Sequence, residues 1–315
     1  MLVIHPNDAE QRLRYGVVGS FALAGLVALR GATPAPERLA VVEGLSVPEA
    51  LSYDAAHGMY FVSNVNGNPG LKENKGFISR ITADGKLDSL HFIQGGRNGV
   101  ELNGPLGSRI RGDTLWVLDV DALRAFDTRT GAAMTSIDLS SLHPQLLNDL
   151  TFMPNGDIYI TDTGWLDSAT APRAPVSYRI YRVTPDLAVS VAAEGKPLDG
   201  PDGIDWDPRR KVLILAPLMG QAMQTWLPGQ AAPTRLMPGP GQYDGLEVEA
   251  DGRVLLTSWG DSTVNELVGN RTMRVVGPME AAPADIAVDA KRGRMGVVLL
   301  TANRFELWTL PAKGN

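Results

Sequence analysis

Oxygen-bearing side chains recur along this chain just before short apolar segments. Asp202, for example, precedes Ile204 and Trp206 at alternating positions, and a turn and a second apolar run follow. This alternation is typical of a half-buried β-strand. Variants of the unit place a residue at the equivalent position six times, at Glu49, Asn103, Asn148, Asp202, Asp244 and Ala284.

Three carboxylates and two carboxamides that converge would repel and desolvate one another unless a cation neutralises them. Oxygen atoms of Asp, Glu and Asn are the ligands of Ca²⁺, which takes about six to eight of them, water included. We therefore expect a Ca²⁺ ion, or another divalent cation, within this ring. The alternative is that Asp-Gly and Asn-Gly pairs only serve turns, but the turns themselves lie elsewhere, as at Asn155-Gly156.

Short strands must position this ring. From Leu39 onward, apolar runs are split by Gly, Asn, Asp and Pro with little helical periodicity, which predicts an all-β domain over 39–315. The ring positions recur every 40 to 54 residues, close to the period of a four-stranded propeller blade. Six units predict a six-bladed β-propeller whose innermost strands start at one mouth of a central channel. A sandwich or open barrel would leave the fixed polar position unexplained.

The second repeat is irregular, because counting back from its turn places Asn103 about two residues early. Loops between the second and third strands should reach the same mouth and form the walls of a site for a small-molecule substrate. The residues that we expect to contact the substrate are Asp244, Trp165, Trp259 and Asn64.

Composition limits the classes of function. The net charge of −6 and the pI of about 5.3 disfavour binding to nucleic acid, because the field of the protein repels polyanions. The absence of cysteine excludes thiol nucleophiles, disulfides and thiolate zinc sites. None of the four histidines has the i, i+4 spacing of a helical zinc pair. Any metal must therefore be held by oxygen or by histidine.

The motifs resemble the gluconolactonase, regucalcin and SMP-30 superfamily of six-bladed calcium propellers, which includes diisopropylfluorophosphatase-like hydrolases. The resemblance covers roughly residues 45–311 and rests on Pro48-Glu49, Leu102-Asn103-Gly104-Pro105, Leu147-Asn148-Asp149, Pro201-Asp202-Gly203, Tyr243-Asp244-Gly245 and Pro283-Ala284-Asp285-Ile286. In that family a first-blade glutamate, asparagines of later blades and a fourth-blade aspartate bind the catalytic metal. By position, the resemblance implies the metal ligands Glu49, Asn148, Asp202 and, less closely, Asn103.

The resemblance also implies a Ca²⁺-dependent hydrolase of a lactone or related ester, in which water or the substrate carbonyl is activated by the metal and Asp202 acts as the base. Some relatives hold a second calcium deeper in the channel. Asp205 and Glu247 would lie at that depth, either around such an ion or as polar groups linked by water. Two departures are the lack of an Arg-Pro-Asn-Asp-Gly segment in the second blade and of a mouth histidine in the last two blades. The alternative is a periplasmic propeller that binds a ligand or protein without catalysis.

Residues 1–38 are distinct from the repeats. Arg12 and Arg14 precede an uncharged apolar run over 15–29, and a Gly/Ala/Pro-rich spacer follows. At about 15 residues the run is short for a bilayer span of roughly 20 and is typical of the apolar helix of an export signal. No clean A-x-A site follows it, so a retained N-terminal membrane anchor is a second interpretation and an amphipathic helix packed on the domain a third. We expect a monomer in the periplasm, or one anchored in the inner membrane and facing the periplasm.

Overall fold

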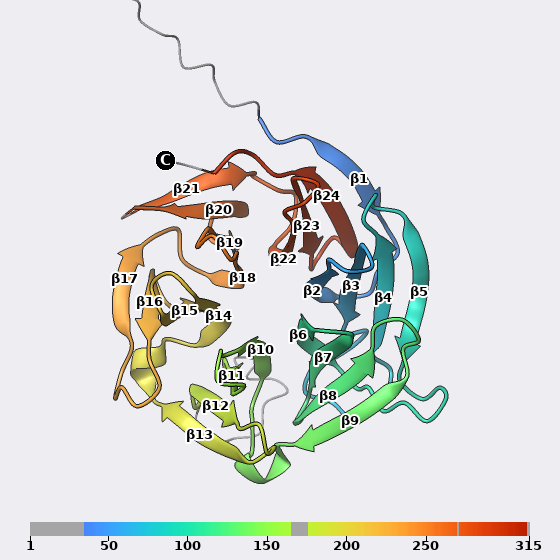
Figure 1. Cartoon of the computed structure of the whole chain (residues 1–315), viewed down its shortest axis with the longest axis horizontal. Helices are drawn as coiled ribbons and strands as arrows, with labels where there is room; N and C mark the ends of the chain where they lie inside the picture. Colours follow the sequence, from blue (N-terminus) through green and yellow to red (C-terminus); the bar gives the residue numbers. More distant parts are fainter. Residues whose placement is uncertain (1–34, 165–175, 270, 314–315) are drawn as a thin grey trace, which may run out of the picture. The chain divides into compact units, whose positions relative to one another are not determined.

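The computed structural model describes residues 35–164, 176–269 and 271–313. These residues form six four-stranded antiparallel sheets around a central axis (Figure 1). The chain is therefore a six-bladed β-propeller, as predicted. The only helices in the described ranges are two 3₁₀ turns, η1 (Ser140–Leu142) and η2 (Lys196–Leu198). Neither is long and apolar enough to cross a membrane. The predicted N-terminal helix and Trp165 lie outside the described residues.

Blades 1 to 5 each take four consecutive strands, ordered from the channel outward. Blade 1 contains β2 (Pro48–Asp54), β3 (Met59–Asn64), β4 (Phe77–Thr82) and β5 (Leu87–Gln94). Blade 2 contains β6 (Pro105–Arg111), β7 (Thr114–Asp119), β8 (Ala122–Asp127) and β9 (Ala133–Asp138). Blade 3 contains β10 (Leu147–Phe152), β11 (Ile158–Asp162), β12 (Arg179–Val183) and β13 (Val189–Glu194). Blade 4 contains β14 (Pro201–Asp207), β15 (Val212–Pro217), β16 (Ala222–Trp226) and β17 (Thr234–Pro238). Blade 5 contains β18 (Tyr243–Val248), β19 (Val254–Ser258), β20 (Thr263–Val268) and β21 (Arg271–Val276).

Blade 6 combines the two ends of the propeller. Its inner strands are β22 (Pro283–Asp289), β23 (Arg294–Leu299) and β24 (Arg304–Thr309), and its outer strand is β1 (Arg38–Val42). β1 pairs with β24 in antiparallel fashion, with Val42 opposite Phe305. The sequence repeats do not predict this closing strand, because it stands apart from the rest of its unit in the chain. Its pairing fastens the ring with main-chain hydrogen bonds.

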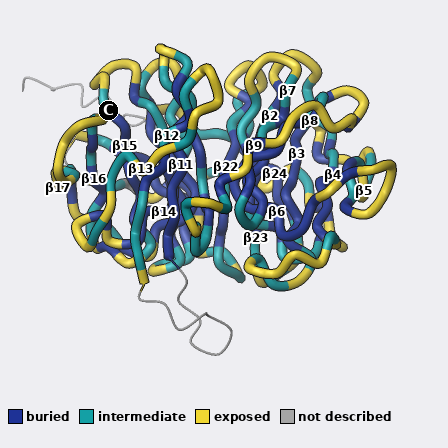
Figure 2. The backbone as a smooth tube through the Cα atoms, turned by 90° about the horizontal axis from the view of Figure 1, so that it is seen from below, coloured by how far each residue is buried: buried dark blue, intermediate teal, exposed yellow. Residues whose placement is uncertain are grey.

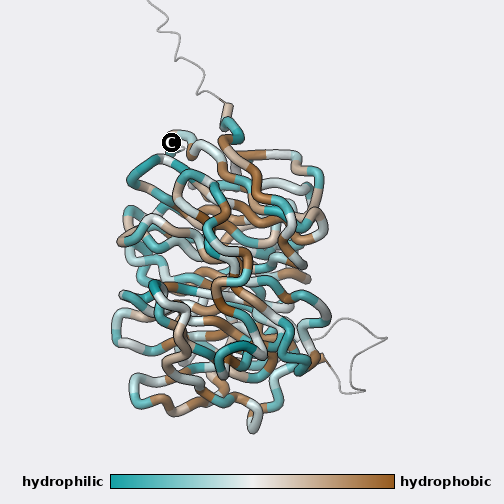
Figure 3. The backbone as a smooth tube through the Cα atoms, turned by 90° about the vertical axis from the view of Figure 1, so that its right-hand side faces the viewer, coloured by the Kyte–Doolittle hydropathy of each residue, from teal (hydrophilic) through white to brown (hydrophobic). Residues whose placement is uncertain are grey.

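Among the described residues, the hydrophobic core consists of six clusters, each between two neighbouring blades. Between blades 6 and 1, for example, Leu51 and Tyr60 pack with Phe305, and all three are buried. Buried residues follow the strands and exposed residues gather in the loops at both ends (Figure 2). Hydrophobic segments are distributed throughout the propeller rather than at one end (Figure 3). Because each blade supplies half of two clusters, the whole ring is needed to bury the core.

The first strand of every blade has a register shift near its start, for example between Pro48 and Ala50 in β2. A regular strand sends consecutive side chains to opposite faces, whereas a bulge re-aims them. Glycine is the third residue of the first strand in three blades, at Gly107, Gly203 and Gly245, and allows the next blade to approach closely. A β-carbon on Gly245 would lie 2.4 Å from Oδ1 of Asp285.

Candidate functional site

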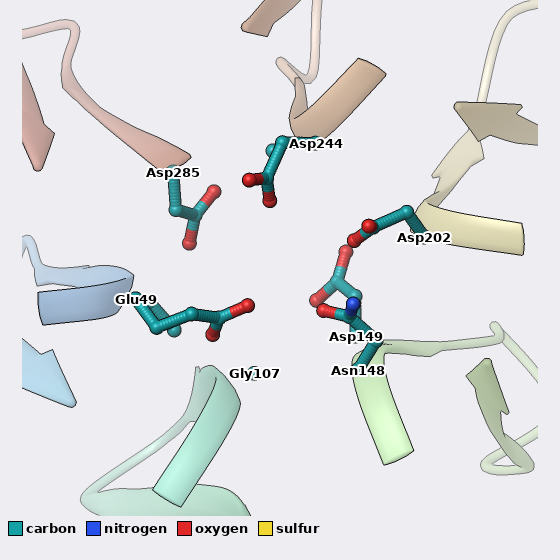
Figure 4. A pocket seen from close by; sticks show the side chains of 9 residues that line it. Glu49, Gly107, Asn148, Asp149, Asp202, Asp244 and Asp285 are labelled. Carbon is teal, nitrogen blue, oxygen red and sulfur yellow. The ribbon is translucent and has the colours of Figure 1, made fainter. Parts of the chain in front are cut away.

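The channel mouth contains a small polar cavity of about 10 Å³, which is room for about one water molecule or ion. All six first strands contribute to its lining, which consists of Glu49, Ala50, Gly107, Asn148, Asp149, Asp202, Asp244, Gly245 and Asp285. The labelled acidic side chains point toward one another across this space (Figure 4). The structure thus brings together four of the residues that the sequence singled out: Glu49, Asn148, Asp202 and Asp244.

These four side chains share a second property. Within the described ranges, none of them is tied to another residue by a hydrogen bond or ion pair. Asn148, Asp202 and Asp244 are nevertheless buried, with 7%, 3% and 5% exposure. Buried polar groups in folded proteins nearly always have a partner. A ligand or an ion bound in this cavity would therefore supply the partners that these oxygen atoms lack within the protein.

Electrostatics at the mouth reflect this crowding. Burial raises the pKa of Glu49 well above its usual value, and the charges of Asp202, Asp285 and Asp149 raise it further. Burial likewise raises the pKa of Asp202 and of Asp244, with neighbouring carboxylates adding to both effects. The protein alone thus favours protonated carboxyl groups here, whereas a bound cation would favour carboxylates.

Two further acids line the cavity and were not predicted as site residues. Asp285 accepts the Leu51 N–H at 2.8 Å, and Asp149 accepts the Ile204 N–H at 2.9 Å, each across a blade boundary. Burial raises the pKa of Asp149 to about 6 and that of Asp285 to about 7. Asp149 and Asp285 each come directly after a ring position, so a regular strand, whose side chains alternate between its two faces, would turn them away from the channel. In blades 2, 4 and 5 the equivalent residue is glycine, and this was the signal in the sequence that the strands bulge here.

Deeper in the channel, an arginine lies where the sequence predicted a second metal or a water network. Nη1 of Arg109 is 2.7 Å from Oε2 of Glu247 and 3.7 Å from Oδ2 of Asp205. Its Nη2 is 3.5 Å from Oδ2 of Asp149. The predictions of a second metal and of a water network did not include Arg109. Its place in the channel follows only from a strand β6 that begins at Pro105.

The structure does not bring Asn103 to the cavity. Pro105 pairs with Asp119 as Pro48 pairs with Asn64, so Leu106 occupies the position in blade 2 that Glu49 holds in blade 1. The Asn103 side chain is used elsewhere. Its Nδ2 donates to Asp119 at 3.0 Å, and its Oδ1 accepts the Asn74 N–H at 3.0 Å. This side chain fastens the loop that leads into β6.

Asn64 also lies apart from the cavity lining. It is fully buried, its Oδ1 accepts the Ser46 N–H at 2.9 Å, and its Nδ2 donates to Val62 O and Ser79 Oγ. Trp259 differs, because it is half-buried in the loop after β19 and its indole N–H has no partner among the described residues. Asn64 thus has a role in loop anchoring, while Trp259 retains a free donor.

The donor set can be tested against a divalent cation. In the described part of the chain, no group of three or more His, Asp and Glu side chains has the arrangement of a formed metal site. The chemistry nevertheless fits, because three carboxylates and one carboxamide are unpaired, are buried or nearly so, and point into one cavity. These are hard oxygen donors of the kind that calcium takes. Glu49, Asn148 and Asp202 are the residues that would hold it, with Asp244 beside them.

Comparisons with known proteins agree with the fold. The model of the SMP-30/gluconolactonase/LRE-like region matches residues 77–292. A solved gluconolactonase from Xanthomonas campestris is 16% identical with a TM-score of 0.63, over 88% of this chain and 89% of that one. A virginiamycin B lyase from Staphylococcus aureus is 16% identical with a TM-score of 0.56, over 87% and 99%. At these identities the solved structures show the fold alone. Comparison by sequence with curated proteins gives no match.

Proposed function

Because this chain belongs to the SMP-30/gluconolactonase/LRE-like family, we propose that it hydrolyses a lactone or a related ester with the help of a divalent cation, Ca²⁺ first among them. One observation carries the proposal. Four unpaired oxygen-bearing side chains from four different blades meet at one buried cavity. Crowded carboxylates of low exposure destabilise the native state when nothing neutralises them, and a bound cation would remove that cost.

Glu49, Asn148 and Asp202 would hold the cation, and Asp244 would contact the substrate or complete the donor set. The cation, when bound, would polarise the carbonyl group of the substrate. Asp202 is 3% exposed and lies between the donors of blades 3 and 5. From there its carboxylate would accept the proton of the attacking water and return it to the leaving oxygen. Burial raises the pKa of Asp202 in the protein alone, and a bound cation would lower it again, which would leave the carboxylate ionised and able to accept a proton.

The substrate would enter from the loop side of the mouth. Trp259, in the loop after β19, is the expected contact there, although its indole N–H is itself buried and unpaired, so its ring rather than its N–H would face the substrate. Trp165 remains an expected contact outside the described residues. The substrate class follows from the family and the cavity chemistry together: a cyclic or open ester whose carbonyl is polarised by a cation.

The test is hydrolysis of gluconolactone and of an aryl ester by the full chain, in EDTA and after addition of Ca²⁺, Mg²⁺ or Mn²⁺. The proposal expects turnover that EDTA abolishes and one of the cations restores. Cation binding without turnover of either compound would favour a non-catalytic binding propeller. Equal turnover in EDTA and in Ca²⁺ would refute the role of the cation.

We also propose that the protein acts in the periplasm, either free or held by its N-terminal segment. The support is the basic start and the apolar run at 15–29. Fusion of alkaline phosphatase after about residue 40 tests it, because this enzyme folds only in an oxidising compartment. An active fusion is expected, and an inactive fusion that is expressed at the same level would place the protein in the cytoplasm.

A further inference from the structure

Arg109 crosses the channel below the mouth and contacts three other blades. It belongs to β6 in blade 2, and its Nε donates to the Leu150 carbonyl in blade 3 at 3.1 Å. Its Nη1 donates to Glu247 at 2.7 Å and its Nη2 to the Leu246 carbonyl at 2.7 Å, both in blade 5. Asp205 in blade 4 lies 3.7 Å from Nη1. One side chain thus joins the inner strands of four consecutive blades.

The charge around this guanidinium is unbalanced. Asp149, Asp205 and Glu247 all lie within ion-pair distance of it, and their side chains are only 14%, 14% and 23% exposed. Arg109 itself is 18% exposed. Three poorly hydrated carboxylates so close together need a cation nearby. A guanidinium suits this place, because its fixed fork of donors serves several oxygen atoms at once.

Two of the three carboxylates, Asp205 and Asp149, are also anchored by the main chain. Asp205 accepts the Val248 N–H at 2.9 Å and the Trp206 N–H at 2.8 Å, as well as the Thr151 hydroxyl at 2.7 Å. Asp149 accepts the Ile204 and Leu150 N–H groups. Their positions are therefore fixed by the inner strands, and removal of Arg109 would leave an anchored acidic cluster rather than one that can swing away.

We propose that Arg109 is the built-in cation of the channel interior, which occupies the place of a divalent ion and thereby limits divalent-cation binding to the mouth. Its hydrogen bonds to blades 3 and 5 and its ion pair with Asp205 in blade 4 then hold blades 2 to 5 together whether or not metal is present. The restriction of divalent-cation binding to the mouth rests on the proposed function, whereas the inference that Arg109 takes the place of an interior ion does not. Arg109 is a positioning residue in this account, because it is not part of the cavity lining and reaches the mouth only through its ion pair with Asp149.

The experiment is calorimetric titration of the metal-free full chain with CaCl₂, together with thermal denaturation in EDTA and in Ca²⁺. Arg109→Gln removes the charge and retains hydrogen-bonding capacity, and Arg109→Lys retains the charge without the fork. Arg253→Gln is the matched control, because Arg253 is also buried and pairs with Glu266 at 2.8 Å, but outside the channel.

We expect one Ca²⁺ per chain for the natural protein, for Arg109→Lys and for Arg253→Gln, and two for Arg109→Gln. In EDTA the Tm of Arg109→Gln should fall by about 10 °C, because an anchored acidic cluster loses its partner. Ca²⁺ should restore most of that loss. For Arg253→Gln, any fall in Tm should be the same in EDTA and in Ca²⁺.

The outcomes separate the two proposals. No Ca²⁺ bound by the natural protein but one bound by Arg109→Gln would refute the mouth site and support Arg109 as the interior cation. Two Ca²⁺ ions in the natural protein, or an unchanged stoichiometry in Arg109→Gln with no larger stabilisation by Ca²⁺, would overturn the proposal for Arg109. If Arg109→Gln does not fold, Arg109→Lys decides: a Ca²⁺-induced rise in Tm equal to that of the natural protein supports the proposal, and a larger rise contradicts it.

Discussion

Gly107 lies directly against the main chain of Asn148 in the neighbouring blade. A β-carbon on Gly107 would stand 2.1 Å from the Asn148 carbonyl oxygen and 2.7 Å from the Asp149 Cα atom. Gly107 belongs to the bulge of β6, so this contact is the place where blades 2 and 3 meet at the mouth. The position of the Asn148 carboxamide, a proposed cation ligand, therefore depends on the lack of a side chain in the next blade.

We expect Gly107→Ala to shift Asn148 and to weaken the cation site. Overpacking of this kind should lower the free energy of unfolding by about 1–3 kcal/mol, and the displaced ligand should lower Ca²⁺ affinity about tenfold or more. Denaturant unfolding and calorimetry measure the two effects. Gly112→Ala is the control in the same blade. It strains a left-handed turn at the far end of β6, so it should cost stability without changing Ca²⁺ affinity. Unchanged affinity in Gly107→Ala would contradict the role of Asn148.

The stability of the metal-free protein should decrease as pH rises. The pKa values of Asp149 and Asp285, about 6 and about 7, lie above the usual value of about 3.9 for an unfolded aspartate. The folded state therefore binds more protons than the unfolded state between about pH 4 and pH 7, and the free energy of unfolding falls as these protons are lost.

The same groups should make the stabilisation of the folded state by Ca²⁺ larger at high pH, because a bound cation neutralises the carboxylates that form as pH rises. We expect the difference in Tm between Ca²⁺ and EDTA to grow from about pH 5 to about pH 8. Thermal denaturation followed by circular dichroism at several pH values measures this difference. A Ca²⁺ effect of equal size at both ends of the range would show that the mouth acids are not coupled to cation binding.

Glu49→Gln should weaken cation binding more than it disturbs the fold. It keeps an oxygen donor but removes one charge from a poorly hydrated site, which should cost Ca²⁺ affinity at least about tenfold. The rise in Tm at a given Ca²⁺ concentration should shrink accordingly, and excess Ca²⁺ should restore turnover. Glu101→Gln is the matched control, because Glu101 is an exposed carboxylate that pairs with Arg124 outside the cavity. If both variants bind Ca²⁺ like the natural protein, Glu49 is not a ligand.

The fold follows from the sequence to a large extent, because each blade repeats the same pattern of polar residue, apolar strand, turn and apolar strand. Glu49, Asn148, Asp202 and Asp244 are placed at the mouth by that repeat alone. Asn103 is the instructive exception. A strand that begins at Pro105 puts Leu106 at the ring position. The available signals were the proline that also precedes Glu49, Asp202 and Ala284, and the two-residue offset counted back from the turn.

Asp149, Asp285 and Arg109 depend on geometry that the sequence does not display. The first two reach the cavity only because the inner strands bulge, and strand periodicity assumes that they do not. Arg109 meets Glu247 across 138 positions of sequence, which only the closure of the ring brings together. Asn64 shows the reverse case, a polar residue at a strand end that fixes a neighbouring loop rather than a substrate.

Asp202→Asn separates catalysis from binding most directly. The variant keeps an oxygen atom that can face the cation but cannot accept a proton, so turnover should fall by about 10²- to 10⁴-fold, while Ca²⁺ affinity falls only modestly. Burial together with the charges of Asp149 and Asp285 raises the pKa of Asp202, so the substitution also relieves repulsion, and the metal-free variant should be at least as stable as the natural protein.

Asp244→Asn is the matched change in the adjacent blade. As a wall residue it should raise KM with little effect on kcat. Steady-state kinetics, calorimetry and thermal denaturation on both variants give the answer. An Asp202→Asn protein with normal turnover would remove Asp202 as the base, and equal losses of kcat in both variants would show that the two acids act together.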